Sequence, residues 1–336
     1  MWKMPVGPEP PAGMHAAAKR VVMNKLLLFL FCVSCAYAQS QDFASTGYSA
    51  GAADYLKLPY SAHSAALGGA VCAWREDLTG AQYNPAILDA ACEGALYLDA
   101  AYTVMTLDRK HISVAGAGTL TKYLAWGASF VNYGVGNIEG RDTFGVLTDN
   151  FNYNENALAL SLAGSMLWNI SAGATVRYLF ESMYTERANG VGFDAGATWQ
   201  PVQMLTIGLA AQNLLSKLWW STSHADPVLP TARLGIAGSW LKNSVRAELD
   251  LVKTQQQPEE INFGAQYTLL EMVSVRGGIS TAVDASSMHS KYPDYSFGLG
   301  MRYSGFGFDF ACLIPDSDLG MSYKFSLVAA LKDIFR

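Results

Sequence analysis

The sequence predicts an all-β protein, a transmembrane antiparallel β-barrel of about 14 strands with an N-terminal hatch. Three observations lead to this fold class. Apolar and polar residues alternate along many segments of the second half of the chain, an export signal lies near the N-terminus, and the composition is apolar although no run of residues could cross a membrane as a helix. Together they favour a barrel in a membrane over a soluble sandwich.

The alternation has a period of two residues. Leu249 and Leu251 interleave with Glu248 and Asp250, and residues 294–303 follow the same rule. This is the period of a strand, because successive side chains of a strand point to opposite faces, whereas a helix of 3.6 residues per turn would scatter them around its axis. Each such segment is therefore predicted to be a strand with one apolar and one polar face.

The export signal lies within residues 1–38. Lys25 precedes an apolar run over residues 26–33, and the small residues of Ala36-Tyr37-Ala38 follow. A basic residue, a short apolar stretch and a small-x-small site are the parts of a secretory signal peptide. We expect cleavage after Ala38.

Two features upstream of this site leave alternatives open. Residues 1–22 are Pro-rich and unpatterned, so the true start is expected at Met23 rather than Met1. Cys35 is an alternative lipidation site, although Cys32 is a poor residue at the position three before it.

The composition narrows the compartment and the function class. The chain is 51% hydrophobic and only 15% charged, whereas a soluble domain usually carries about 25% charged residues. The apolar run of the signal peptide is too short for a helical span, and no longer run follows it. Such a chain suits a barrel of the bacterial outer membrane. The net charge of −5 argues against nucleic acid as a partner.

The alternating segments number 14 when their boundaries are placed to within a few residues. They are 95–105, 110–119, 122–138, 154–165, 168–181, 190–200, 204–214, 230–240, 243–253, 260–268, 272–281, 294–303, 306–313 and 318–331.

The connections between these segments fall into two classes. Longer connections are expected at 139–153, 182–189, 215–229, 254–259 and 282–293, and tight turns alternate with them. Outer-membrane barrels show this asymmetry, with short periplasmic turns and longer external loops. An even number of strands places both ends of the barrel in the periplasm. Splitting 122–138 at Gly134 and Gly136 would give an odd number, so we predict one long strand bent at these glycines.

Residues 39–92 do not alternate, and they precede the barrel at 93–336. Small residues fill Ala66-Leu67-Gly68-Gly69-Ala70, and Asn84-Pro85-Ala86 begins a turn. Small residues pack closely, so this stretch is predicted to fold as a hatch inside the lumen.

These residues resemble the N-terminal hatch of the FadL-like outer-membrane protein family. The resemblance rests on Ala66 to Ala70, Asp77, and Asn84 to Leu88, and it is most similar to the PorV/PorQ-like branch and to the uncharacterised spirochaetal FadL-like family. It implies a transporter for long-chain fatty acids or similar apolar molecules, gated by the hatch. The alternative that it implies is a PorV-like component that binds exported cargo proteins.

The resemblance also implies site residues. Gly68, Gly69 and the Asn84-Pro85-Ala86 turn would belong to a hatch that shifts with ligand, or would only cap a helix. A substrate would leave sideways at a bend in the third strand, which places a lateral gate at Gly134 and Gly136; an ordinary bulge is the alternative.

Several further residues are candidates in their own right. Trp219 and Trp220, in a long loop, would offer an apolar landing site or would fold back onto the rim. Inward-facing Arg246 and Arg302 would hold a carboxylate head group or pair with other lumen charges, among which are Arg177, Asp194, Glu248, Asp250 and Arg276.

Cysteines and the C-terminus give two weaker expectations. Cys72 and Cys92 flank the hatch and could bridge in an oxidising compartment. The final strand leads to Ile334-Phe335-Arg336, an imperfect form of the C-terminal aromatic signal that barrel-assembly machinery reads.

The sequence contains no signature of an enzyme, a cofactor site or a metal site. The predicted partners are therefore an apolar small molecule, outer-membrane lipid, the barrel-assembly machinery and, on the alternative reading, an exported protein.

Overall fold

A computed structural model describes residues 51–75, 77–91, 95–283, 293–315 and 320–332. Residues 1–50, which include the predicted signal peptide and Cys35, lie outside the described residues together with Cys92 and the last four residues, and so do the predictions made for them. No helix in the described part of the chain is both long and apolar enough to cross a membrane.

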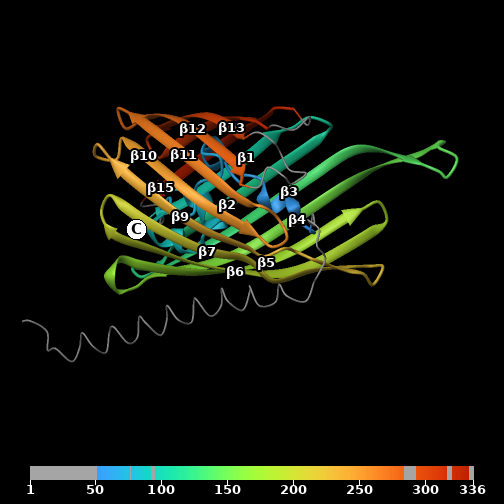
Figure 1. Cartoon of the computed structure of the whole chain (residues 1–336), viewed down its shortest axis with the longest axis horizontal. Coiled ribbons are helices and arrows are strands. Elements are labelled where there is room, and N and C mark those ends of the chain that lie inside the picture. Colours follow the sequence, from blue (N-terminus) through green and yellow to red (C-terminus); the bar gives the residue numbers. More distant parts are fainter. Residues whose placement is uncertain (1–50, 76, 92–94, 284–292, 316–319, 333–336) are drawn as a thin grey trace, which may run out of the picture. The chain divides into compact units, whose positions relative to one another are not determined.

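The described strands form one antiparallel sheet that closes on itself (Figure 1). Its wall consists of β1 (Ala95–Val104), β2 (Arg109–Thr121), β3 (Leu124–Arg141), β4 (Leu147–Ser165), β5 (Ile170–Met183), β6 (Glu186–Val202), β7 (Leu205–Trp220), β9 (Thr231–Trp240), β10 (Val245–Thr254), β11 (Glu259–Leu269), β12 (Val273–Ala282), β13 (Asp294–Tyr303), β14 (Phe306–Ile314) and β15 (Ser322–Lys332). Each pairs with its neighbours, β1 pairs with β15, and β6 pairs with β7. The prediction of a closed barrel of about 14 strands is confirmed.

The predicted long connections at 139–153, 182–189 and 215–229 differ from those observed, whereas the one at 254–259 is present at residues 255–258. Residues 284–292 of the predicted connection at 282–293 lie outside the described residues. β3 continues to Arg141 and β4 begins at Leu147, so most of 139–153 is a protruding hairpin. β5 and β6 leave only two residues between them, and the short β8 (Ala225–Pro227) pairs antiparallel with the end of β7. Paired backbone groups satisfy each other, so a hairpin that rises beyond the barrel replaces an irregular loop.

The strand connections define two ends of the barrel. The loop end carries residues 105–108, 142–146, 184–185, 221–230 and 255–258, and the turn end carries residues 122–123, 166–169, 203–204, 241–244, 270–272 and 304–305. One turn contains the short helix η5 (Leu167–Asn169).

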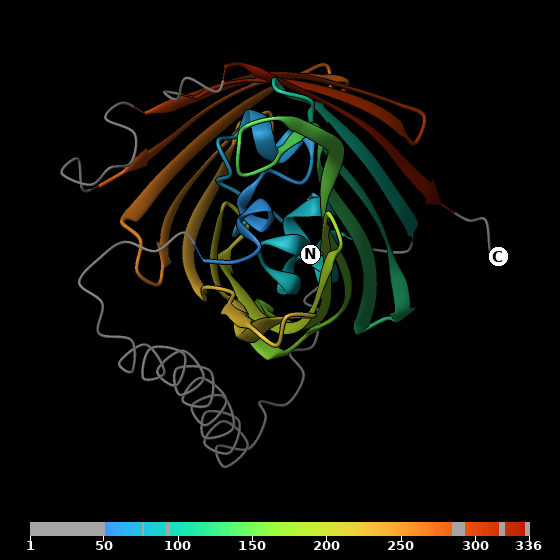
Figure 2. The same ribbon diagram turned by 90° about the vertical axis from the view of Figure 1, so that its right-hand side faces the viewer.

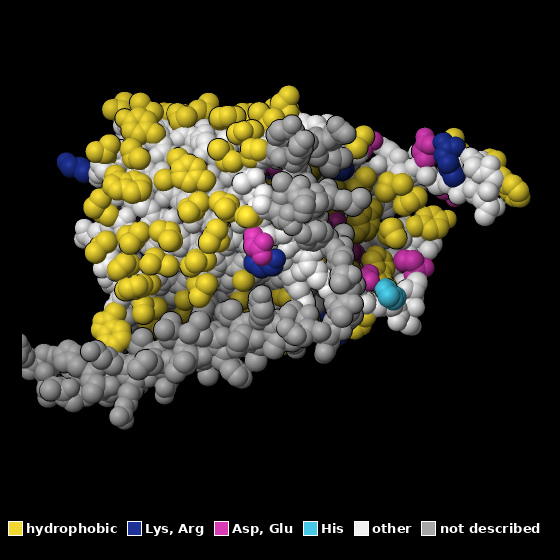
Figure 3. All heavy atoms as spheres, in the orientation of Figure 1, with side chains coloured by type: hydrophobic (Ala, Val, Ile, Leu, Met, Phe, Trp, Pro, Cys, Tyr) yellow, Lys and Arg dark blue, Asp and Glu magenta, His cyan; other side chains and the backbone are white. Residues whose placement is uncertain are grey.

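The alternation has the predicted consequence for burial. On β10, Leu249 and Leu251 are 43% and 48% exposed on the outer face, while Glu248 and Asp250 are 1% and 0% exposed on the inner face. Hydrophobic side chains cover the visible outer wall (Figure 3). An apolar outside and a polar inside are the arrangement of a barrel surrounded by lipid.

The described part of the predicted hatch lies inside the barrel (Figure 2). This luminal segment (residues 51–75 and 77–91) contains η2 (Asp54–Lys57), α2 (Ala62–Ala66), η3 (Leu78–Gln82), η4 (Pro85–Ile87) and α3 (Leu88–Ala91). Tyr55, Tyr60 and Tyr83 pack with Val131 and Leu179 of the wall in an apolar cluster. The cluster fills the lumen beside β3 to β7.

Two glycines of the wall permit this close packing. A Cβ at Gly278 of β12 would overlap the backbone of Leu67 and Gly68, and one at Gly196 of β6 would overlap the side chain of Asn84. No other residue type leaves room for the luminal backbone at these two positions.

Candidate functional site

A cavity of about 410 Å³ opens between the luminal segment and the loop end of the barrel. Its apolar lining includes Leu58, Pro59, Val252, Leu313 and Ile314. The wall residues come from β1, β2 and β9 to β15, on the side of the lumen that the apolar cluster leaves open. The lining also includes the charged residues Lys57, Arg109, Arg233, Glu260 and Asp294. A concave site that combines apolar side chains with converging polar groups is the usual form of a small-molecule site.

Three buried polar side chains form one part of the cavity lining. Thr103 of β1 lies between His111 of β2 and Lys324 of β15, its partners across the two ladders. Lys324 Nζ donates to the carbonyl oxygen of Pro59 and lies 3.1 Å from His111 Nδ1. His111 and Lys324 are each 1% exposed.

This cluster has unused hydrogen-bonding capacity. His111 Nε2 and Thr103 Oγ1 have no hydrogen-bond partner among the described residues. Lys324 forms no salt bridge with any described residue. A buried ammonium group that forms no ion pair is costly. The cluster is therefore complementary to an anionic or hydrogen-bond-accepting group of a ligand in the cavity.

A second cavity, of about 330 Å³, lies at the turn end. It is lined by Arg75 and Trp74 of the luminal segment and by Gln200, Ser239 and Arg246 of the wall, and it shares no lining residue with the first. Luminal residues line both cavities from opposite sides, so this segment stands between them.

Asn84 fastens the turn-end side of the luminal segment. Its Nδ2 donates to the carbonyl oxygens of Cys72, at 2.8 Å, and of Ala197 in the wall, at 3.2 Å, while its Oδ1 accepts from Ala86 N at 3.1 Å. Asn84 thus caps η4, with Pro85 at its first position. The turn at Asn84 therefore caps a helix in the structure, and a ligand-driven shift of this turn stays a prediction.

Gly68 and Gly69 end α2. Their φ angles are 63° and 78°, and their N–H groups donate to the carbonyl oxygens of Ala65 and Ser64 at 3.1 and 3.0 Å. Left-handed glycine is the common helix terminator. Both residues also line the larger cavity.

Two wall carboxylates hold the middle of the luminal segment. Asp250 Oδ2 accepts from the backbone N–H groups of Val71 and Cys72, each at 3.1 Å, and Glu248 Oε1 accepts from that of Ala73 at 2.5 Å. Carboxylates that accept backbone N–H bonds form the stronger, charge-assisted class of hydrogen bond. These inward charges of β10 therefore tether the luminal segment.

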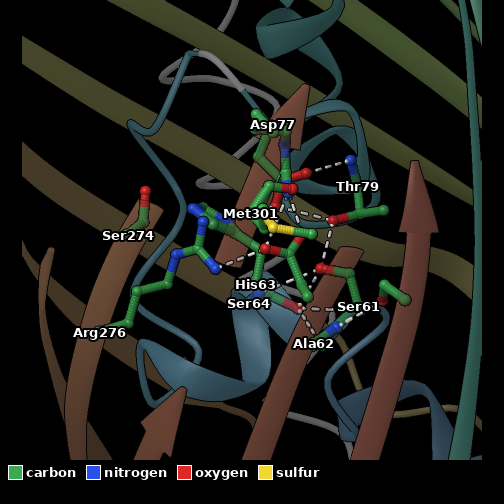
Figure 4. A network of polar contacts seen from close by, with 12 residues as sticks. Ser61, Ala62, His63, Ser64, Asp77, Thr79, Ser274, Arg276 and Met301 are labelled. Carbon is green, nitrogen blue, oxygen red and sulfur yellow. Dashed lines mark hydrogen bonds and ion pairs between the residues drawn. The ribbon is translucent and has the colours of Figure 1, made fainter. Parts of the chain in front are cut away.

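A polar network joins α2 to η3 within the luminal segment (Figure 4). His63 Nδ1 lies 2.7 Å from Asp77 Oδ2, and Thr79 Oγ1 lies 2.8 Å from the same oxygen and 2.7 Å from Ser61 Oγ. Burial alone would raise the pKa of Asp77, but the His63 ring and the Thr79 hydrogen bonds lower it to about 2. Asp77, part of the family-like motif, thus has a structural role.

The other predicted lumen charges are ion-paired. Arg302 and Arg276 each contact Asp309 at 2.6 Å, and Arg177 contacts Asp194 at 2.5 Å. Neither Arg246 nor Arg302 lines the larger cavity. The scaffolding alternative describes Arg177, Arg276 and Arg302, whereas Arg246 lines the second cavity. A head-group role for Arg246 or Arg302 stays a prediction.

The glycines predicted for a lateral gate lie at a bulge. The β3–β4 register shifts between Val135 and Ile138, and Asn137 has a φ of 53°. Gly134 and Gly136 are next to this shift, yet β2 and β3 pair without a break from Val135 to Ala125. The predicted bend is present as a bulge, and neither glycine lines a described cavity.

Trp219 and Trp220 face opposite sides of β7. Trp220 packs against the apolar cluster and donates from Nε1 to Asp226 Oδ2 at 2.8 Å, whereas Trp219 is 52% exposed.

Cys72 is fully buried, and burial raises the pKa of its thiol.

The sequence reasoning missed the three polar residues of the cavity. A signal was present, because Lys324 alternates with Tyr323 and Phe325 and therefore had to face inward. No group of three or more His, Cys, Asp or Glu side chains suited to a metal ion occurs among the residues that the structure describes.

Comparison with known proteins gives a clear result for the fold. No protein-family model matches the sequence, and no curated protein matches it. The toluene transporter TodX of Pseudomonas putida aligns over 81% of this chain and 99% of its own, with 12% identity and a TM-score of 0.56. The monoaromatic hydrocarbon channel CymD covers 86% and 99%, with 12% identity and a TM-score of 0.56. A FadL homologue of Pseudomonas aeruginosa covers 81% and 98%, with 12% identity and a TM-score of 0.52.

These structures are hydrocarbon channels and a FadL homologue, and none of them is a PorV-like or PorQ-like protein or a spirochaetal one. The placement in that branch stays a prediction. Identity this low shows the fold alone: the chain folds as a closed FadL-like β-barrel.

Proposed function

We propose that this protein is an outer-membrane channel for apolar molecules that carry a polar head group, with long-chain fatty acids as the leading candidates. The observation that carries the proposal is the apolar cavity at the loop end, with Lys324, His111 and Thr103 buried in its lining. The apolar lining would hold the hydrocarbon part of the ligand. The ammonium group of Lys324 would hold the carboxylate, as a charge-assisted hydrogen bond.

The fold likeness supports apolar cargo in general, without a head group. TodX is described as a toluene transporter and CymD as a monoaromatic hydrocarbon channel. Apolar substrates avoid water, and an apolar cavity in a barrel with an apolar belt gives them a passage past the polar surface of the membrane.

In this proposal the luminal segment is the gate, because it lies between the two cavities. A ligand in the larger cavity touches Gly68 and Gly69 at the end of α2. A local shift of the luminal segment would then open the way toward the turn end. A sideways exit at Gly134 and Gly136 is a second route within the proposal, supported by the bulge in β3.

Replacing Lys324 with methionine tests the proposed head-group site. A hydrogen bond to a charged group contributes about 1.5–3 kcal/mol, so the K324M protein should bind a fluorescent long-chain fatty acid roughly 10- to 100-fold more weakly. Its affinity for toluene, which has no head group, should not change. Both affinities are measured on refolded protein in detergent.

The matched control is Lys253→Met, because Lys253 pairs with Glu259 and does not line the cavity. Equal loss of fatty-acid affinity in both variants would argue against a head-group site at Lys324. If the wild-type protein binds neither ligand while remaining folded, the channel proposal itself fails.

A further inference from the structure

Two glutamates face each other on the inner wall near the loop end. Glu155 of β4 and Glu181 of β5 are direct partners across the antiparallel ladder, and they are 6% and 4% exposed. Side chains at such positions have Cβ atoms about 4.5–5.5 Å apart, and like charges there repel. Burial strengthens the repulsion, because little water screens it.

The described residues offer this pair no positive charge. Two basic side chains of the lumen have other partners: Arg177 contacts Asp194 at 2.5 Å, and Lys57 contacts Asp54 at 2.7 Å. Glu181 Oε2 accepts a long hydrogen bond, 3.4 Å, from Tyr153 Oη, and Glu181 Oε1 has no hydrogen-bond partner among the described residues.

The luminal segment contributes a third buried polar group, the hydroxyl of Tyr55. Tyr55 of η2 is 3% exposed, and its hydroxyl has no hydrogen-bond partner in the described part of the chain. Tyr55 belongs to the same apolar cluster as Ala157 of β4 and Leu179 of β5, which are paired with each other and lie two residues from Glu155 and Glu181 on the same face of the wall. Burial and the charges of Glu181 and Glu155 raise the pKa of Tyr55, whereas Arg177 lowers it. Carboxylate and phenol groups of β4, β5 and η2 thus share this part of the lumen, and the salt bridges of the described residues include none to either glutamate.

We propose that Glu155 and Glu181, with the oxygens of Tyr55 and Tyr153, bind a hard divalent cation such as Ca²⁺. Calcium takes oxygen ligands in flexible geometry and completes its shell with water, so two carboxylates can anchor it. The set contains no nitrogen or sulfur ligand and does not suit zinc. Because Tyr55 belongs to the luminal segment, the cation would link that segment to the wall. This site is separate from the larger cavity and does not depend on the proposed transport function.

Terbium luminescence tests the site, because Tb³⁺ replaces Ca²⁺ and emits when a nearby tyrosine is excited. Full-length protein in detergent, freed of metal with a chelator, is titrated with Tb³⁺ and then with competing Ca²⁺. We expect saturable emission that Ca²⁺ abolishes. Changes around a metal site commonly alter affinity about 10- to 100-fold, so Glu155→Gln and Glu181→Gln should each weaken binding at least roughly tenfold.

Glu186→Gln is the matched control, because Glu186 lies at the same end of the wall and bonds Ser221 instead. Heat-modifiable migration on a gel confirms that each variant is folded. Tb³⁺ affinity in Glu155→Gln or Glu181→Gln equal to that of the control would overturn the proposal. So would wild-type protein without saturable emission, because the two carboxylates would then share a proton rather than a cation.

Discussion

Valine in place of Gly278 is expected to displace the luminal segment and open the barrel to small solutes. A Cβ at this position would overlap the backbone of Leu67 and Gly68, which cannot move aside as a flexible side chain could. Overpacking of a core costs about 1–3 kcal/mol, and a clash with backbone is expected to exceed that range. In planar bilayers the variant should show a clearly larger conductance than the wild-type protein.

Gly277 provides the control for this experiment. A Cβ at Gly277 would meet only Ser296 O, at an ordinary 4.0 Å. Gly277→Val therefore adds the same side chain to the same strand without touching the luminal segment. If Gly278→Val folds and conducts no more than Gly277→Val, the luminal segment does not close the lumen in the way described.

Alanine in place of Asn84 should loosen the turn-end side of the luminal segment while the barrel stays intact. The change removes three hydrogen bonds and leaves the buried carbonyl group of Cys72 without the donor that Asn84 supplies. A stranded buried polar group costs about 1–3 kcal/mol, and the loss of the cap on η4 adds about 1 kcal/mol. Local opening should become about 2–4 kcal/mol easier.

Hydrogen exchange measured by mass spectrometry follows this opening directly. Peptides that cover residues 71–88 should exchange faster in Asn84→Ala, whereas those of β12 and β13 should keep their protection. Asn150→Ala, at an exposed position of β4, serves as the control. Unchanged exchange over 71–88 would mean that Asn84 does not hold the segment in place.

The barrel could be predicted from the sequence because its main signal is local. One residue faces lipid and the next faces the lumen, so the strand period is visible in any short segment, as Leu249, Asp250 and Leu251 show. The positions of the strand ends were less accurate for β3, β4 and β7. The register of β3 with β4 shifts after Val135, and adjacent positions of β4 such as Asp149 and Asn150 are both polar, so the alternation is lost there. In β7 the register with β6 shifts near Phe193, which interrupts the alternation before the strand ends at Trp220.

The contacts inside the lumen could not be predicted in the same way. Gly278 lies against Gly68, and Asp250 accepts from Val71, because the barrel closes around a segment that is about 180 to 210 residues away. A glycine in a strand signals a close approach but does not name the group that approaches.

The candidate site could be predicted only in part. The alternation alone would have turned Lys324, His111 and Thr103 inward, since each occupies the polar face of its strand. What brings them together is the register of β1 with β2 and β15. The same holds for Glu155 and Glu181, which become neighbours only through the turn at residues 166–169 that joins β4 to β5.

A crystal structure with a brominated long-chain fatty acid is the most direct test of fatty-acid binding in the larger cavity. The anomalous signal of bromine locates the hydrocarbon tail, and the density beside it locates the carboxylate. We predict that bromine lies in the cavity beside Val252 and Leu313, with the carboxylate at Lys324 and His111. Bromine found only on the outer apolar belt, with no ligand in the lumen of a saturated crystal, would contradict the proposed function.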